Sequence, residues 1–168
     1  MGRFGQGLGA HSLILLGVAT LAVIGDRLTK AWVVATVEVG EQIPVIGDLL
    51  QVWHTENSGA AFGLLPGGGA LFVMVGIATL AVVAWVHLTG RLPGPWAALL
   101  LGLVAGGTLG NLVDRLAGGT VTDFISVGIG DRLRWPTFNV ADSAVFIGIV
   151  ALVMLLSIHD RRAAADAA

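Results

Sequence analysis

The sequence predicts an all-α membrane protein: a four-helix transmembrane bundle that carries a small extracytoplasmic β-rich platform. The first observation is composition, since 55% of the 168 residues are hydrophobic and only 12% are charged. Soluble domains average about 25% charged residues, so much of this surface does not face water. The second observation is that the apolar residues gather in four long stretches with polar segments between them.

Each of the four stretches has the length of about 20 residues that a helix needs to cross the hydrocarbon core. They run from about 11 to 32, 70 to 88, 92 to 115 and 139 to 159. The second contains no Asp, Glu, Lys or Arg, and the third is uncharged until its last two residues. We therefore expect residues 1–168 to form one integral membrane domain.

The first stretch begins like a secretory leader, because Arg3 precedes the apolar run. No small-residue cleavage site follows, and the run ends instead in Asp26, Arg27 and Lys30. We expect this segment to be retained as a helix.

Four spans place both termini on one side of the membrane and the loops 33–69 and 116–138 on the other. The basic residues divide four to five between these sides, but the four on the terminal side lie in short segments. Because their density is higher there, we expect both termini to be cytoplasmic. The four are Arg3, Arg91, Arg161 and Arg162.

The first long loop is expected to be ordered. Thr36–Ile46 and Leu49–Thr55 are rich in valine and isoleucine, alternate partly with period two, and are separated by Gly47-Asp48. These features predict small strands on the membrane surface. Residues 66–69, with the sequence Pro-Gly-Gly-Gly, should interrupt the chain before the second span.

Two compositional facts exclude whole classes of function. The chain has no cysteine, which excludes disulfides, thiolate metal sites and a cysteine nucleophile. Its net charge of -2 excludes a basic nucleic-acid-binding protein, so no nucleic acid partner is expected.

Two polar clusters near the first loop each allow two interpretations. Asp26 and Lys30 stand four residues apart on one helical face, where they could simply form a surface ion pair. Asn57-Ser58-Gly59 is ordinary turn chemistry, although a buried Asn57 amide could also hydrogen-bond a substrate carbonyl. Polar groups aimed into a membrane bundle are costly and usually functional.

The third span combines small and polar residues at helical spacing. A glycine at every fourth position provides a surface on which another helix can pack closely. Asn111, with Asp114 or Arg115 one turn later, forms a polar stripe beside these glycines. Unpaired donors near the bilayer are costly, so Asn111 and Arg115 are harder to explain by packing alone. The glycines are Gly102, Gly106 and Gly110.

The last cluster contains two aspartates. Asn139 followed by Asp142 has the pattern of a helix N-cap with an acid in the first turn. Asp123 stands alone in an apolar run that predicts a strand or flap over the mouth of the bundle. Alternatively, two carboxyl groups brought together share one proton. The ionised one can then deprotonate a water while the neutral one polarises a scissile carbonyl.

In their order along the chain, these clusters resemble the motifs of the lipoprotein signal peptidases (signal peptidase II), which are bacterial membrane aspartyl peptidases. Each motif is weak alone, but five in this order are very specific, and the four-helix plan and chain length also agree. The matching segments are Asp26-x-x-Thr29-Lys30, Asn57-x-Gly59-Ala60-Ala61-Phe62-Gly63, Gly106-Gly107-x-x-Gly110-Asn111-x-x-Asp114-Arg115, Val121-x-Asp123-Phe124 and Phe138-Asn139-x-Ala141-Asp142.

The resemblance implies an aspartic endopeptidase in the bacterial cytoplasmic (inner) membrane, with its active site near the extracytoplasmic face. Its substrate would be a prolipoprotein that carries diacylglycerol on the lipobox cysteine, cleaved just before that cysteine. Members of the family need no metal or organic cofactor, in keeping with the lack of a His/Cys ligand cluster here. We expect a monomer whose other partner is membrane lipid.

The resemblance also implies roles for individual residues. Asp123 and Asp142 match the catalytic pair, and Asp26 matches an acid associated with the architecture of the site. The residues that would line the site, hold the substrate or support the pair are Asn57, Gly59, Asn111, Asp114, Arg115 and Asn139.

Three other functions stay open at this point. A small proton- or cation-coupled transporter would also bury acids, but near the midplane, where the second and third spans carry no ionisable residue. A serine peptidase would pair His54 with Ser58, although these lie in a loop without an apparent orienting acid. A purely structural membrane protein would not require Asp123.

Overall fold

The structure, a computed structural model, describes residues 2–59, 69–92, 94–130 and 133–166, with side chains between residues 9 and 158. Within these ranges the chain forms four helices and one small sheet. The helices are α1 (Gly2–Thr36), α2 (Gly69–Leu88), α3 (Pro95–Gly118) and α4 (Val140–Asp166). The strands are β1 (Gln42–Ile46), β2 (Leu50–Asn57), β3 (Val121–Ile129) and β4 (Leu133–Arg134).

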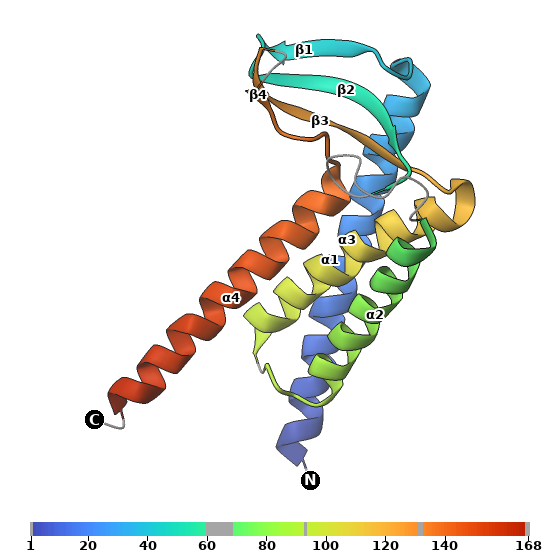
Figure 1. Cartoon of the computed structure of the whole chain (residues 1–168). Coiled ribbons are helices and arrows are strands. Elements are labelled where there is room, and N and C mark those ends of the chain that lie inside the picture. The colour runs from blue at the N-terminus through green and yellow to red at the C-terminus, as the bar shows by residue number, and fades with distance from the viewer. Residues whose placement is uncertain (1, 60–68, 93, 131–132, 167–168) are drawn as a thin grey trace.

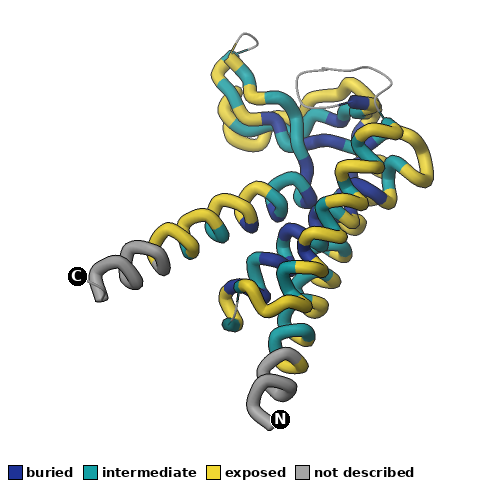
Figure 2. Tube along the Cα trace, turned by 60° about the horizontal axis from the view of Figure 1, so that its bottom comes forward, coloured by how far each residue is buried: buried dark blue, intermediate teal, exposed yellow. Residues whose placement is uncertain are grey.

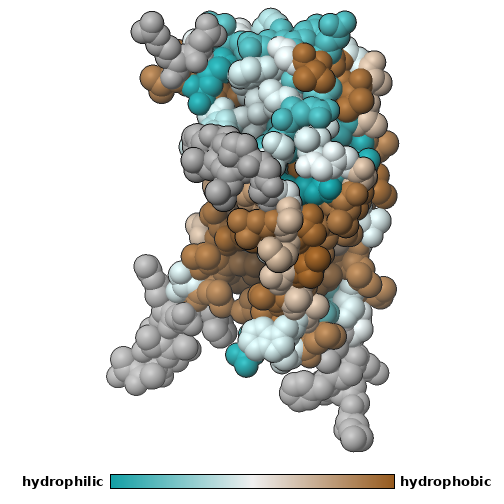
Figure 3. Space-filling model, turned by 45° about the vertical axis from the view of Figure 1, so that its right-hand side comes forward, coloured by the Kyte–Doolittle hydropathy of each residue, from teal (hydrophilic) through white to brown (hydrophobic). Residues whose placement is uncertain are grey.

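All four helices contain a segment long and apolar enough to span a membrane, which confirms the predicted fold class. Figure 1 shows the sheet at one end of the bundle and both chain ends at the other. Hydrophobic side chains cover the outer surface of the helices, and hydrophilic ones gather over the sheet (Figure 3). Large apolar side chains are more than half exposed on all four helices, as expected where they face lipid. Examples are Leu13, Leu21, Met74, Leu88 and Phe146.

The predicted helix boundaries are accurate for α2 and displaced for the other three. The predicted start of α3 at Leu92 is wrong by three residues, because Gly94 has φ 106° and Pro95 occupies the first helical turn. The end is also three residues later than predicted. There Gly119 adopts a left-handed conformation and its N–H donates to the carbonyl oxygen of Arg115.

The other two helices are longer than predicted. α1 continues through Val33 to Thr36 because Val33 and Val37 are fully buried against Phe124 of β3. α4 starts at Val140 and continues past residue 159 to Asp166, through an alanine-rich segment with high helix propensity.

The sheet joins strands from both long loops in the order β1-β2-β3-β4, with antiparallel neighbours. The predicted strand Thr36–Ile46 is wrong in its first half, since Thr36 ends α1 and β1 starts only at Gln42. The second predicted strand corresponds to β2. The predicted breaker falls mainly on residues 66–68, which lie outside the described ranges.

The centre of the bundle is α3, which packs against the other three helices. Figure 2 shows buried positions concentrated along it, while the outer faces of the neighbouring helices are exposed. A Cβ added at Gly106 would lie 2.5 Å from the carbonyl oxygen of Ala19 in α1. One added at Gly107 would lie 2.3 Å from the carbonyl oxygen of Ala141 in α4. The packing interpretation of the glycines is therefore confirmed, since these helices approach at backbone distance.

Candidate active site

A cavity of about 770 Å³ opens where the sheet meets the bundle. Asp123 of β3 and Asp142 of α4 both line it, together with Asn57, Gly59 and Arg115. The predicted pair is thus brought to one cavity from two elements, β3 and α4, which are separated in the chain by β4. Most of the wall is apolar, and it includes Phe72, Val127, Pro136, Phe138, Phe146 and Ile147.

Asp123 is 2% exposed, and both of its carboxylate oxygens accept hydrogen bonds. Asn57 Nδ2 donates to Oδ2 at 2.9 Å, and Asn139 Nδ2 donates to Oδ1 at 2.6 Å. Burial raises the pKa of Asp123 to about 6, and the negative charge of Asp142 adds to this effect. The two amide hydrogen bonds and the positive charge of Lys30 oppose the rise in pKa.

Asp142 lies in the first turn of α4, where it and Asn139 cap the helix reciprocally. The Asp142 backbone N–H donates to Asn139 Oδ1 at 2.8 Å, and the Asn139 backbone N–H donates to Asp142 Oδ2 at 3.1 Å. This is the geometry of a capping box, so the N-cap interpretation is confirmed. The second carboxylate oxygen, Oδ1, still faces Asn111, whose Nδ2 donates to it at 2.7 Å.

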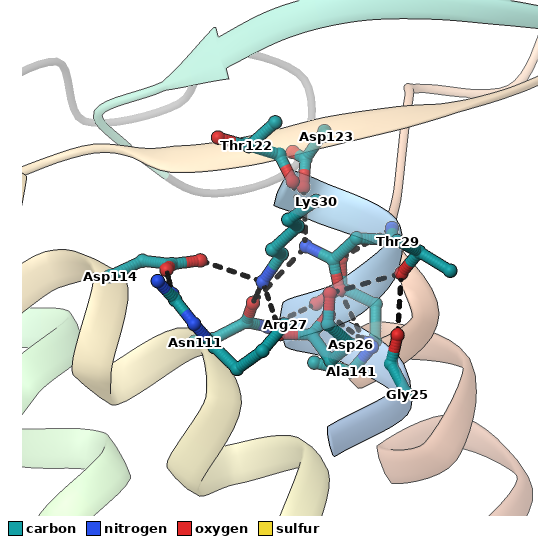
Figure 4. A network of polar contacts seen from close by, with 12 residues as sticks. Gly25, Asp26, Arg27, Thr29, Lys30, Asn111, Asp114, Thr122, Asp123 and Ala141 are labelled. Carbon is teal, nitrogen blue, oxygen red and sulfur yellow. Dashed lines mark hydrogen bonds and ion pairs between the residues drawn. The ribbon is translucent and has the colours of Figure 1, made fainter. Parts of the chain in front are cut away.

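Asn111, which is 9% exposed, connects the two aspartates to a buried lysine. Figure 4 shows Asn111 beside Lys30. Asn111 Oδ1 accepts from Asn139 Nδ2 at 3.1 Å and from Lys30 Nζ at 3.0 Å. Lys30 Nζ lies 2.7 Å from Oδ2 of Asp26 and 2.7 Å from Oδ2 of Asp114. Asp114 therefore supports Lys30 and does not line the cavity.

The ion pair between Asp26 and Lys30 is present, but the prediction of a surface pair is wrong. Asp26 is 0% exposed and Lys30 3% exposed. A Cβ added at Gly110 would lie 2.7 Å from Asp26 Oδ2, so only glycine lets α1 approach α3 here. The other oxygen of Asp26, Oδ1, accepts the backbone N–H of Ala141 at 3.0 Å, which links α1 to the first turn of α4.

Arg115 contributes a cation to the cavity wall. Its Nη1 donates to the carbonyl oxygen of Asn111 at 3.4 Å, and its guanidinium lies 5.1 Å from the ring centre of Phe72. The buried Nε atom has no hydrogen-bond partner among the described residues. Arg115 therefore keeps donors available beside the two carboxyl groups.

Gly59 lines the cavity and donates its N–H to Asn57 Oδ1 at 2.9 Å, which turns the Asn57 amide nitrogen toward Asp123. The rest of that motif, Ala60–Gly63, lies outside the described residues. Sequence reasoning gave no role to Thr55, whose Oγ1 bonds both the Asp123 carbonyl at 3.2 Å and Thr137 at 2.7 Å. No sequence signal pointed to this contact, because it depends on strand pairing.

The sequence analysis considered Lys30 only as the partner of Asp26 in an ion pair and gave it no role in the active site, although it stands in the first motif. The signal that could have found it is its position, since a lysine inside a bundle needs buried partners. The serine peptidase alternative lacks support in the structure. The His54 ring is 3% exposed and its Nδ1 bonds the Val37 carbonyl at 2.7 Å, whereas Ser58 is exposed.

Comparisons with known proteins identify the family of this chain. The family model described as signal peptidase (SPase) II matches residues 18–158. The lipoprotein signal peptidase of Rhodococcus jostii (strain RHA1) is 41% identical over 149 residues, covering 85% of this chain and 72% of its own. That of Syntrophomonas wolfei is 42% identical over 147 residues, covering 87% of this chain and 94% of its own.

Two solved structures, both described as bacterial membrane enzymes studied by the in meso method, share the fold. The one at 2.3 Å resolution has a TM-score of 0.77 and 31% identity, covering 84% of this chain and 86% of its own. The one at 1.9 Å has a TM-score of 0.75 and 30% identity, with coverages of 84% and 91%. None of these matches favours a transporter. The chain therefore belongs to the signal peptidase II family and is a multi-pass membrane protease.

Proposed function

We propose that this protein is an aspartic endopeptidase that removes signal peptides from diacylglyceryl-modified prolipoproteins, cleaving just before the lipid-modified cysteine. The name shared by its relatives, lipoprotein signal peptidase, supports the substrate class. The observation that carries the mechanism is the single cavity lined by both Asp123 and Asp142. Residues 1–168 act together as one membrane peptidase domain.

The two carboxyl groups divide acid and base work between them. We assign the shared proton to Asp123, because burial raises its pKa to about 6, and the role of base to Asp142. Asp142 takes a proton from the attacking water while Asp123 gives its proton to the scissile carbonyl oxygen. The tetrahedral intermediate returns a proton to Asp123, and Asp142 protonates the amide nitrogen as the C–N bond breaks. The pH profile should be bell-shaped, with limbs that belong to the pair.

The remaining residues hold the substrate and orient this pair. Asn57, held by Gly59, and Asn139 position Asp123, while Asn111 positions Asp142. Arg115 has donors available for the substrate backbone beside the carboxyl groups. The further supporting residues, behind Asn111, are Asp26 and Asp114.

The surroundings of the cavity support a lipid-linked substrate. Its aromatic and aliphatic wall would accept acyl chains or an apolar signal peptide, and it lies where the hydrophobic bundle surface gives way to the hydrophilic sheet (Figure 3). We place the protein as a monomer in the bacterial cytoplasmic (inner) membrane. Both termini are cytoplasmic, the site is near the extracytoplasmic face, and membrane lipid is the second partner.

Cleavage of a diacylglyceryl-modified lipobox peptide by the purified full-length chain tests this function. Cleavage should need the lipid, should be insensitive to EDTA and serine-directed reagents, and should disappear in Asp123→Asn and Asp142→Asn. Asp48→Asn, at the exposed turn between β1 and β2 away from the cavity, is the matched control and should cleave normally. Substantial turnover by either site variant would contradict the mechanism, and equal cleavage of the unmodified peptide would contradict the substrate.

A further inference from the structure

The site contains a buried ammonium group that takes no part in the proton transfers. Lys30 is 3% exposed, although lysine is almost never fully buried without partners. Its Nζ donates to Asp26 Oδ2 at 2.7 Å and to Asn111 Oδ1 at 3.0 Å, and forms an ion pair with Asp114. An ammonium group has three N–H donors, and each needs an acceptor when the group is buried. Two of these donors face carboxylates, and Asn111 Oδ1 is the third acceptor.

The chemistry of an ammonium group determines which way the Asn111 amide points. An amide presents an acceptor on one side and two donors on the other, whereas Lys30 can only donate. The oxygen of Asn111 must therefore face Lys30, and the amide nitrogen must face Asp142, where Nδ2 donates at 2.7 Å. Without the lysine, Asn111 Oδ1 would keep only one of its two donors, Asn139 Nδ2, and the amide would be held less firmly against Asp142.

The same orientation reaches the second aspartate through Asn139. Because Asn139 Oδ1 accepts the backbone N–H of Asp142, its Nδ2 is directed toward Asn111 Oδ1 and Asp123 Oδ1. Lys30 is thus two hydrogen bonds from one catalytic carboxylate, through Asn111, and three from the other, through Asn111 and Asn139. Figure 4 shows Lys30 beside Asn111, Asp26 and Asp114.

We propose that Lys30 is a positioning residue of the active site, whose ammonium fixes the Asn111 amide and through it the hydrogen bonds of both catalytic carboxylates. This inference rests on the proposed function of Asp123 and Asp142. It assigns to the buried cluster on α1 and α3 a role in catalysis in addition to helix packing.

The charges around Lys30 give the sign of its effect on the pair. Asp26 of α1 and Asp114 of α3 pair with Lys30, and its charge also acts on Asp123 of β3. Asp142 of α4 lies beyond Asn111, and Arg115 of α3 interacts with Asp114, Asp123 and Asp142. Replacing Lys30 by a neutral residue removes one positive charge from this group and so adds negative potential at Asp123 and Asp142. The positive charge of Lys30 lowers the pKa of Asp123, so its loss should raise that pKa.

The test compares Lys30→Met with Arg27→Gln in the full-length protein, using the diacylglyceryl-modified lipobox peptide. Arg27 is the matched control because it pairs with the same Asp114 from the same helix, yet its side chain is 49% exposed. In Lys30→Met we expect kcat to fall about tenfold or more and KM to change little. The alkaline limb of kcat/KM should move up by about half a pH unit or more. Arg27→Gln should match the wild type in all three.

A second variant guards against failure to fold, since Lys30→Met leaves Asp26 without the cation that pairs with it and leaves Asp114 with Arg27 alone. Asp26→Asn/Lys30→Met removes one of these acids and keeps Arg27 for Asp114. It should show the same loss of kcat, because Asn111 still lacks its donor. Unchanged kcat and pH limbs in either folded variant, an equal effect of Arg27→Gln, or failure of both variants to fold would overturn the positioning role. A wild-type protein that leaves the peptide intact would instead contradict the proposed function.

Discussion

Asn111 of α3 donates from Nδ2 to Oδ1 of Asp142, 2.7 Å away in the first turn of α4. The other oxygen of Asp142 accepts the backbone N–H of Asn139, so both carboxylate oxygens are held in place. In the proposed mechanism, Asp142 takes a proton from a water molecule at a fixed position, so its carboxylate must be held in one orientation. Misplacement of a catalytic group by about 1 Å can lower the rate a hundredfold.

Replacing Asn111 tests the restraint directly. We expect Asn111→Ala to lower kcat about ten- to hundredfold, because Asp142 loses a donor and Lys30 loses an acceptor. The protein should still insert and purify, as judged by its yield and elution from a sizing column. Leu109→Ala, at a 40% exposed position of the same helix, should retain wild-type turnover. Normal activity of Asn111→Ala would mean that the hydrogen bond from Asn111 to Asp142 contributes only to packing.

The two aspartates should act as one unit. Since the proton transfers need both groups, Asp123→Asn combined with Asp142→Asn should be scarcely slower than either single variant. Single-turnover cleavage of the lipid-modified peptide by all three variants measures this. Losses that multiply, so that the double variant is far slower than both single ones, would mean that the two groups act independently.

Asp123 should make the stability of the fold depend on pH. The ordinary pKa of an aspartate is 3.8, and in the folded protein the pKa of Asp123 is raised to about 6. The folded state therefore favours the neutral carboxyl. The stability that this contributes is complete below about pH 4 and is lost as pH rises through about 6. Relative to Asp123→Asn, the wild type should therefore lose about 2–3 kcal/mol over this range. Thermal melts in detergent measure this difference, and Asp48→Asn should parallel the wild type.

The close approach of α3 and α4 should tolerate no side chain at Gly107. A Cβ there would lie 2.3 Å from the Ala141 carbonyl oxygen, next to the turn that holds Asp142. Gly107→Ala should destabilise the protein by about 1–3 kcal/mol and lower kcat beyond what unfolding explains. Gly17→Ala in α1, where a Cβ meets nothing within 4 Å, should be neutral or stabilising. Melting temperatures and turnover of the two variants decide the matter.

The orientation in the membrane has its own test. Reporters fused after Gly90 and after the C-terminus should read cytoplasmic, and one inserted near Gly47, beside β1, should read external. Alkaline phosphatase and green fluorescent protein, active on opposite sides of the membrane, give complementary readings. An external C-terminus would reverse the placement of the sheet and the site.

The features that the sequence predicts correctly are those that depend on neighbours along the chain. A helix satisfies its own backbone hydrogen bonds, so its presence follows from the length of an apolar run, and α2 lies within one residue of its prediction. The capping pair Asn139 and Asp142 is equally local, because the two residues stand three positions apart in the chain. The sequence also marked Asp123 and Asn57 as motif positions, and both line the cavity.

What only the tertiary structure decided is how distant residues meet. Pairing of β2 with β3 sets Thr55 opposite Asp123 and brings Asn57, 66 residues away, within hydrogen-bonding distance. The burial of Lys30 depends on Asn111, 81 residues later in the chain. It also depends on the close packing of α1 against α3, which leaves no room for a side chain at Gly110. Strand pairing and ion-pair burial are set by contacts between elements, and neither the length nor the periodicity of a single segment carries that information.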